Sequence, residues 1–341
     1  MSPPTEFYQP YAELHKTPNG PGDGRPTAMK IIEDEGLINK WSNKVILVTG
    51  SNIGLGAETV RALHATGAKL FMTVRTKSKA EPVIADILKT SPSQVPIEVV
   101  EMELSNMASI RKAAESFLSR SSQLNIMINN AAIMASPFHK TDDGFEAQIG
   151  INHLSHFLLF SLLKDTLIKS STPDFASRVI NISSAGHRMN LVDLDNINFE
   201  KEGSYTPMAG YGASKTANIW FANEIDRRYG GEGLRGLSLH PGVIMATGLT
   251  RQTDPKAFEG FDMSKWAPIE KSVEQGAATQ VWAATAKALE GKGGVYLADC
   301  GVAVPADPSG EIGGNDFSDW AYDEEKAKKL WEYSEKAVGV A

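Results

Sequence analysis

The stretch Lys44-Val-Ile-Leu-Val-Thr-Gly-Ser-Asn-Ile-Gly-Leu-Gly56 joins a short apolar run to a loop with three spaced glycines. Residues 45–48 contain only valine, isoleucine and leucine, which is typical of a strand buried on both faces of a parallel sheet. Gly50, Gly54 and Gly56 then allow a sharp turn, close approach of a ligand to the backbone, and packing of the next helix on the strand.

A glycine-rich loop that leads into a helix gathers free N–H groups and the positive end of the helix dipole. It therefore predicts a site for a pyrophosphate group. A glycine-rich turn without any ligand is the alternative, because a single glycine triplet is a weak signal. Support has to come from the rest of the chain.

Apolar segments along the chain alternate between the strand pattern and the helix pattern. The further strands are expected at residues 69–74, 97–102, 126–132, 179–182, 234–239 and 294–297, of which the last is expected to be the final strand. Helices are expected at residues 57–66, 144–163 and 209–229, and another is expected to end at Phe117. This alternation predicts an α/β fold, a single-domain Rossmann-type doubly wound parallel sheet of about seven strands with helices on both faces.

The composition limits the classes of protein to which the chain can belong. It has 341 residues, of which 42% are hydrophobic, so it can bury one large α/β core. The net charge of −7 argues against nucleic acid or an anionic membrane surface as a partner. Cys300 is the single cysteine, which favours a reducing compartment. No apolar run approaches the roughly 18 residues of a membrane span, and the N-terminus does not resemble a signal peptide, so a soluble, cytoplasmic protein is expected.

Composition also divides the chain into three expected parts. Residues 1–40 carry clusters of Pro, Gly and Asn and predict an irregular N-terminal arm with one short element near residues 29–35. Residues 41–310 form the expected catalytic domain. Residues 311–341 form a C-terminal extension with an amphipathic helix, which could pack on the domain, close the substrate cleft or join a homo-oligomer.

The end of the second expected strand bears on the cofactor, because the adenosine ribose of a nicotinamide dinucleotide meets this strand end. An acidic residue there would bind a free 2′-hydroxyl and repel a 2′-phosphate. The sequence instead has Arg75, Thr76 and Lys77, with no carboxylate before Glu81. Charge-assisted hydrogen bonds from these cations favour NADP(H) over NAD(H). A solvated basic strand end is the alternative.

The segment Tyr211-Gly-Ala-Ser-Lys215 places a tyrosine and a lysine on one face of the expected helix. A tyrosine hydroxyl titrates near ~10, which is too high for efficient proton transfer at neutral pH. A neighbouring ammonium stabilises the phenolate and is expected to lower the pKa of Tyr211. Ser184, which follows an expected strand, could hold a substrate oxygen nearby. An ordinary surface pair and a turn are the alternatives, but the glycine-rich loop upstream argues against them.

With these residues the chain resembles the short-chain dehydrogenase/reductase family over about residues 44–297. The family pattern Thr-Gly-x-x-x-Gly-x-Gly is present at residues 49–56, and the pattern Tyr-x-x-x-Lys at Tyr211 and Lys215. Ser184 matches the catalytic serine of the family.

Further segments are similar to one branch of this family. Asn152 matches the helix asparagine of the family. Residues 143–156 and 331–336 resemble retinol dehydrogenases and protochlorophyllide reductases, a branch that tends to prefer NADP(H).

The resemblance implies hydride transfer between the nicotinamide C4 and the carbonyl carbon of a substrate. Tyr211 would be the general acid in reduction, and Ser184 would position the carbonyl oxygen. Lys215 would hold the nicotinamide ribose and lower the pKa of the tyrosine, while Asn152 would support a water-linked proton path. Ser183 is the rival of Ser184, but the family usually uses the second serine of such a pair.

The resemblance also implies which residues bind the cofactor. They come from the glycine-rich loop, the following strand ends and the catalytic pair, namely Gly50, Asn52, Ile53, Gly54, Leu55, Gly56, Arg75, Glu103, Leu104, Asn130, Ala131, Tyr211, Lys215, Pro241, Val243 and Thr247. Three positions depart from the family pattern. Ala132 replaces a glycine, Glu103 replaces an aspartate that contacts adenine, and one extra residue precedes Thr247. The extra residue leaves open whether Thr247 reaches the nicotinamide carboxamide.

Two segments are expected to enclose the substrate, residues 185–210 and residues 246–275. Their large apolar side chains are Met189, Leu191, Leu194 and Phe199 in the first and Leu249, Phe258, Phe261, Met263 and Trp266 in the second. Apolar residues in loops around a cleft favour a bulky hydrophobic ketone, aldehyde or alcohol as the small-molecule substrate. Packing of these loops on the domain body is the alternative.

No metal site is expected. His153 and His156 have no carboxylate at a ligand-like spacing beside them, so core or surface histidines, including His187, are the simpler interpretation. The sequence therefore indicates an NADPH-dependent reductase of ketones or aldehydes, or an alcohol dehydrogenase. Two alternatives stay open, a catalytically silent NADP(H)-binding sensor or interaction protein of the same fold, and a redox-linked isomerase.

Overall fold

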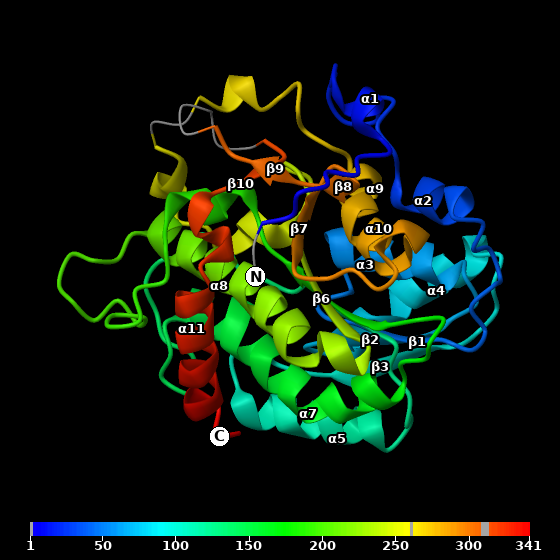
Figure 1. Cartoon of the computed structure of the whole chain (residues 1–341), viewed down its shortest axis with the longest axis horizontal. Helices are drawn as coiled ribbons and strands as arrows, with labels where there is room; N and C mark the ends of the chain where they lie inside the picture. Colours follow the sequence, from blue (N-terminus) through cyan, green and yellow to red (C-terminus); the bar gives the residue numbers. More distant parts are fainter. Residues whose placement is uncertain (1–2, 260–261, 308–313) are drawn as a thin grey trace.

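A central sheet organises the molecule (Figure 1). The computed structural model describes residues 3–259, 262–307 and 314–341. In spatial order the strands of the sheet are β3 (Ile97–Glu101), β2 (Lys69–Val74), β1 (Val45–Val48), β4 (Ile126–Asn129), β5 (Ser177–Ile182), β6 (Leu234–His240), β7 (Val295–Ala298) and β8 (Gly301–Val302). All pair in parallel except β8, which is antiparallel to β7. The expected doubly wound, mostly parallel sheet is confirmed.

The residues of β1 alternate between two hydrophobic cores, one on each face of the sheet. Ile46 and Val48 lie in one core and Val45 and Leu47 in the other. The first core includes residues of α2 (Ala28–Asp34), α3 (Gly54–His64), α4 (Glu81–Thr90) and α10 (Ala278–Thr285). The second includes residues of α5 (Met107–Leu118), α7 (Ser155–Lys169), α8 (Pro207–Tyr229) and α11 (Glu324–Ala337). Because helices cover both faces, β1 has no polar residue.

Short elements fill the connections between these layers. The remaining helical ones are α1 (Ala12–His15), η1 (Lys77–Lys79), α6 (Ala147–Ile149), η2 (Gly150–Leu154), η3 (Ala185–Met189), η4 (Gly230–Glu232), η5 (Gly248–Gln252), η6 (Pro255–Phe258), η7 (Met263–Lys265), α9 (Val273–Gly276), η8 (Lys287–Leu289) and η9 (Asp319–Tyr322). A small separate sheet pairs β9 (Val304–Pro305) with β10 (Asp316–Phe317).

The direction of the strand order reverses between β1 and β4. The chain passes from β1 outward to β2 and β3, and then returns through α5 to β4 on the other side of β1. In an open α/β sheet this reversal leaves a crevice at the carboxyl ends of the two strands. The glycine-rich loop follows β1 and Asn130 follows β4, so both lie at this crevice.

The N-terminal arm is fastened to the domain body. The short element expected near residues 29–35 is α2, whose Ile31 and Ile32 are fully buried. A further short helix, α1, was not expected. Val302 N donates a hydrogen bond to Tyr8 O over 2.9 Å, which ties the start of the arm to the edge of the sheet.

The C-terminal part of the chain has more strands than the sequence predicts. The expected last strand is β7, but it is not the last, because β8, β9 and β10 follow it. Each of these has two residues, which is too short for a strand pattern to be recognised in the sequence. The expected boundary between residues 310 and 311 lies outside the described residues. Among the described helices, none is both long enough and apolar enough to cross a membrane.

Candidate active site

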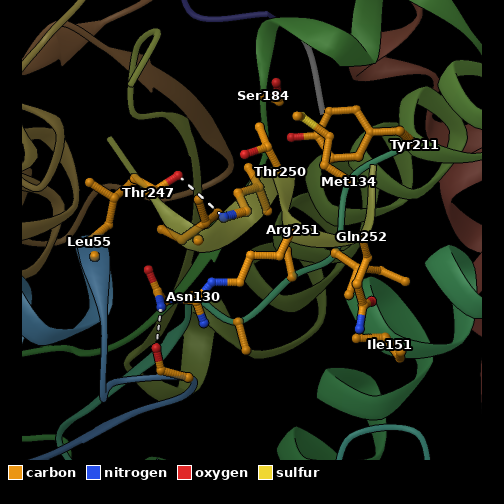
Figure 2. A pocket seen from close by; sticks show the side chains of 18 of the residues that line it. Leu55, Asn130, Met134, Ile151, Ser184, Tyr211, Thr247, Thr250, Arg251 and Gln252 are labelled. Atoms are coloured by element: carbon orange, nitrogen blue, oxygen red, sulfur yellow. Dashed lines mark hydrogen bonds between the residues drawn. The ribbon is translucent and has the colours of Figure 1, made fainter. Parts of the chain in front are cut away.

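A cavity of about 610 Å³ lies at the carboxyl ends of the central strands. The glycine-rich loop, the loops after β4, β5 and β6, and α8 line it. Figure 2 shows Leu55 and Asn130 on one side and Ser184 and Tyr211 on the other. Residues 247–252 run between the two sides.

The glycine-rich loop is a cradle that only glycine permits at two positions. A Cβ atom on Gly50, whose φ is +61°, would lie 2.6 Å from the Cβ atom of Ala131. A Cβ atom on Gly56 would lie 2.4 Å from the Gly50 carbonyl oxygen. The loop opens directly into the N-terminus of α3. This cradle suits the pyrophosphate of a dinucleotide.

The segment after β4 holds this loop in shape. Asn130 N and Ala131 N each donate to Thr49 Oγ1 over 3.0 Å. Asn130 Nδ2 donates to Thr49 O over 2.9 Å and to Gly50 O over 3.2 Å. The Asn130 amide therefore fixes the glycine-rich loop against the end of β4.

Helix α8 supplies the tyrosine and the lysine. It begins after Thr206, whose Oγ1 accepts a hydrogen bond from Ala209 N over 3.1 Å, with Pro207 at its first position. Tyr211 and Lys215 lie one turn apart and are almost fully buried. The Lys215 Nζ lies 5.5 Å from the centre of the Tyr211 ring and donates to Ile182 O over 3.0 Å.

Burial determines the protonation of this pair. It raises the pKa of Tyr211 to about 12, although the hydrogen bond with Ser184 lowers the value somewhat. Burial also lowers the pKa of Lys215 to about 7. The predicted acidic phenol is therefore wrong for this structure, because desolvation of the buried phenol raises its pKa and the interaction with Ser184 offsets only part of this rise. A lysine with a pKa of about 7 is only partly protonated at pH 7. It therefore stabilises a phenolate less than a fully protonated lysine does.

The two consecutive serines after β5 have different surroundings. Ser184 lines the cavity beside the Tyr211 side chain, since a Cβ atom on Gly186 would lie 3.4 Å from Ser184 Oγ and 3.0 Å from Tyr211 Cε1. The Ser184 Oγ accepts a hydrogen bond from Gly186 N over 3.0 Å. Ser183 Oγ donates to Lys215 O over 2.7 Å, which connects β5 to α8. Both serines line the cavity, but the Ser183 hydroxyl is already engaged by the backbone of α8.

Asn152 lies behind the cavity rather than in its wall. It belongs to η2, a π-helical stretch between α6 and α7. Its Oδ1 accepts from Ile133 N over 2.9 Å, and its Nδ2 donates to Ile133 O over 3.0 Å and to Ser214 Oγ over 2.9 Å. Both polar ends of the side chain are therefore occupied by protein groups beside α8.

The ends of β2 and β3 form the far end of the cavity. Arg75 is exposed and lines it. Glu103 also lines it, but its Oε1 accepts a hydrogen bond from Ser105 N over 3.1 Å. Lys77 N donates to Glu101 Oε1 over 2.8 Å, and its side chain is not part of the lining. Arg75 is the basic residue here that faces the cavity.

The loop after β6 returns to the glycine-rich loop despite its extra residue. Pro241, Val243 and Thr247 all line the cavity. A Cβ atom on Gly54 would lie 3.5 Å from Thr247 Cβ, so the two loops are in contact. The structure thus places Thr247 beside the start of α3.

Every residue that the sequence assigned to the cofactor lines this cavity, and so do Ser184, Tyr211 and Lys215, whereas Asn152 does not. The predicted substrate segments contain further lining residues that the sequence did not single out, namely Met208, Thr250, Arg251 and Gln252, and Met134, Ile151 and His240 were not predicted at all. Most of these come from irregular segments or 3₁₀ turns, which carry no periodic signal in the sequence.

The two expected substrate segments contribute unequally. Met189, Leu249, Phe258 and Trp266 line the cavity. Other expected residues pack elsewhere: Leu191 and Leu194 contact the cluster that contains Trp220, and Phe199 lies 5.4 Å from the Tyr205 ring. Phe261 and the side chain of Met263 lie outside the described residues. Part of the first segment therefore packs on the body, as the alternative interpretation held.

His153 and His156 are buried and bonded to protein groups. His153 Nε2 lies 2.9 Å from Ser334 Oγ, and His156 Nε2 lies 2.9 Å from Thr49 Oγ1. Burial lowers the pKa of His153 to about 3 and that of His156 to about 4. In the part of the chain that the structure describes, no three His, Cys, Asp or Glu residues form a cluster suited to a metal ion.

Comparisons with known proteins agree with this geometry. A family model described as short chain dehydrogenase matches residues 44–196. The short-chain dehydrogenase/reductase prx1 of Penicillium roqueforti is 49% identical over 97% of this chain and 95% of its own length. Human retinol dehydrogenase 11 is 36% identical over 87% of this chain and 86% of its own length. A solved structure of an uncharacterised Mycobacterium paratuberculosis protein is 29% identical, covers 89% of this chain and 97% of its own, and has a TM-score of 0.66.

The chain therefore belongs to the short-chain dehydrogenase/reductase family. The predicted resemblance, including that to retinol dehydrogenases, is confirmed. Membership makes the chain an oxidoreductase by family.

Proposed function

We propose that this protein is an NADP(H)-dependent dehydrogenase/reductase that acts on a bulky hydrophobic carbonyl compound or alcohol. One observation carries the proposal. The Tyr211 hydroxyl and Ser184 meet at one side of a cavity whose other side is a glycine cradle suited to pyrophosphate. A dinucleotide on that cradle would place its nicotinamide end toward the tyrosine.

Each residue of this site has a role that follows from its position. The cofactor, when bound, supplies or accepts the hydride. Ser184 holds the substrate oxygen by a hydrogen bond, and Tyr211 donates a proton to this oxygen in reduction or removes one in oxidation. Lys215, which lines the cavity beside Tyr211, would bind the ribose hydroxyls of the cofactor and would favour the deprotonated tyrosine when it is charged.

Asn152 acts as a positioning residue in this proposal. Its amide joins Ile133, in the wall of the cavity, to Ser214, the neighbour of Lys215. It thereby fixes α8 relative to the segment after β4. A π-helical stretch at such a place is common at functional sites.

Arg75 supports the preference for NADP(H). It is a cation at the end of β2, faces the cavity, and has no carboxylate neighbour in the sequence before Glu81. A guanidinium binds a phosphate through two parallel hydrogen bonds, and an aspartate or glutamate at this place would repel it. We expect the wild-type chain to bind NADPH at least tenfold more tightly than NADH, and Arg75→Ala to remove most of this difference.

The cavity lining supports a hydrophobic substrate. The wall of the cavity contains the large apolar side chains Met134, Met189, Met208, Leu249, Phe258 and Trp266. Such a wall holds an apolar molecule by burial of its surface, while Ser184 and Tyr211 orient the single polar end. The name of the relative retinol dehydrogenase 11, which denotes a lipophilic alcohol, agrees with this class of substrate.

The decisive experiment measures Tyr211→Phe. A panel of hydrophobic aldehydes and ketones would be tested with NADPH, and consumption followed at the nicotinamide absorbance. We expect kcat to fall by about 10²–10⁴-fold, the usual contribution of a general acid, with the Kd for NADPH changed less than twofold. Undiminished turnover in this variant would contradict the assignment, and binding of NADPH without turnover of any substrate by the wild type would favour a cofactor sensor.

A further inference from the structure

A short segment crosses the cavity and is held at both ends. We call residues 247–254 the strap. At its first end Thr247 contacts Gly54 of the glycine-rich loop. At its second end Thr253 Oγ1 donates to Met134 O over 2.9 Å, and Asp254 N donates to Ala135 O over 2.8 Å. The strap therefore joins the loop after β1 to the segment after β4, over the space between them.

The first turn of the strap is a 3₁₀ helix that fixes the direction of its side chains. Thr247 Oγ1 accepts a hydrogen bond from Leu249 N over 3.4 Å and caps η5. Thr250, Arg251 and Gln252 follow in η5 and line the cavity. The direction of these side chains is thus set by backbone structure.

Arg251 is the charged residue of η5. Its side chain folds back over Gly248, since a Cβ atom there would lie 3.0 Å from Arg251 Cζ. Figure 2 shows it extending across the cavity toward the side that carries Asn130. Asn130 is hydrogen-bonded to Gly50 O, so this side is the glycine cradle. Within residues 3–259, 262–307 and 314–341, no carboxylate or hydrogen-bond acceptor pairs with the Arg251 side chain.

Other cations of the lining differ from Arg251 in their partners or their place. Lys140 pairs with Glu200 over 2.9 Å, and Lys215 donates to Ile182 O. Arg75 lies at the far end, after β2. Arg251 is therefore a cation that faces the glycine cradle and has no partner among the residues that the structure describes.

We propose that Arg251 binds the pyrophosphate of the nicotinamide dinucleotide from the side opposite the glycine-rich loop. This inference rests on the proposed function. The loop would bind the two phosphates through backbone N–H groups, and the Arg251 guanidinium would add charge-assisted hydrogen bonds from the opposite side. Because NADPH and NADH share the pyrophosphate, Arg251 contributes equally to both, unlike Arg75.

The test measures equilibrium binding of NADPH and NADH by the enhancement of nicotinamide fluorescence, without substrate. We expect Arg251→Ala to raise the Kd for both dinucleotides about tenfold, because one charge-assisted contact is lost. Arg251→Lys should show an intermediate loss, since an ammonium keeps the charge but not the fork geometry. Lys256→Ala is the matched control, because Lys256 is an exposed cation nearby in the chain that does not line the cavity.

Each outcome decides the assignment. Equal losses for NADPH and NADH in Arg251→Ala, with Lys256→Ala unchanged, would support it. A weaker binding of NADPH alone would indicate that Arg251 binds the 2′-phosphate. Unchanged Kd values for both dinucleotides would indicate that Arg251 binds an anionic group of the substrate instead. Either result would overturn the inference while the proposed function stands. A wild-type chain that binds neither dinucleotide would refute both.

Discussion

Lys215 is a residue whose protonation is strongly altered by its surroundings. Burial lowers its pKa to about 7, whereas an unfolded chain holds a lysine near ~10.5. Between these two values the unfolded chain binds more protons than the folded one. The free energy of unfolding from this residue therefore rises with pH over the window from about 7 to about 10.

Lys215→Met tests this sign. At pH 7 we expect the variant to be more stable than the wild type by roughly 2 kcal/mol, because methionine carries no charge to desolvate. The difference should shrink as the pH rises toward 10, where the wild-type lysine is neutral in both states. Urea unfolding at several pH values measures it, with Lys256→Met, at an exposed position, as the control. A difference that stays constant from pH 7 to pH 10 would argue against the lowered pKa.

Gly56 is a position where the backbone leaves no room for a side chain. A Cβ atom there would meet the Gly50 carbonyl oxygen at 2.4 Å and the Asn130 Nδ2 at 2.6 Å. Gly56→Ala should lower the free energy of unfolding by about 1–3 kcal/mol, the usual cost of overpacking, and weaken dinucleotide binding as the loop moves. Gly231→Ala, where no atom lies within 4 Å of the added Cβ, serves as control and should change both quantities little. Normal stability and binding in Gly56→Ala would show that the loop relaxes freely.

At the scale of elements, the N-terminal arm supports the loop that ends the substrate segment. Arg25 is buried and donates to three carbonyl oxygens, those of Gly20, Ile269 and Glu270. Glu270 forms an isolated bridge with Val243, which lines the cavity. The arm is thereby connected through backbone groups to the wall of the site.

Arg25→Ala should loosen this connection. We expect the free energy of unfolding to fall by about 2–3 kcal/mol, since several buried carbonyls lose a charged donor. Cleavage by a protease within residues 246–275 should become faster, because this segment is held at one end by Arg25. Lys16→Ala provides the comparison, as Lys16 is an exposed arm residue whose ammonium pairs with the exposed Glu13. An unchanged cleavage pattern would mean that the segment is held without the arm.

At the scale of the whole molecule, acid sensitivity follows from histidines buried in several elements. His153, His156, His187 and His240 are buried, and burial lowers their pKa values to about 3, 4, 4 and 3. An unfolded chain holds them near ~6.5 and so binds more protons below that pH. The stability of the fold should therefore fall as the pH drops from 6.5 toward 4.

His153→Gln tests one member of this group. An amide keeps a donor for Ser334 but does not titrate, so the variant should lose less stability between pH 6.5 and pH 4.5 than the wild type. Each buried imidazole is expected to contribute up to about 1.4 kcal/mol per pH unit below 6.5. Thermal unfolding at three pH values, with exposed His139→Gln as the control, measures the difference. Parallel pH profiles for His153→Gln and the wild type would contradict the prediction.

The sequence alone was enough to predict the doubly wound, mostly parallel sheet and many of the residues that line the cavity beside the glycine-rich loop. Residues 45–48, the glycines after them, and the spacing of Tyr211 and Lys215 each carry a local pattern, because backbone geometry and periodicity depend on near neighbours. The short strand β8 and the π-helical η2 carry no such pattern and were not predicted.

Only the tertiary structure placed Arg251 over the cradle and Asn152 behind the wall, because these positions depend on contacts between segments far apart in the chain. Only the structure also reversed the expected pKa of Tyr211. Its protonation depends on how completely helix α8 and its neighbours exclude water, and burial of that kind is a property of the assembled fold rather than of a four-residue spacing.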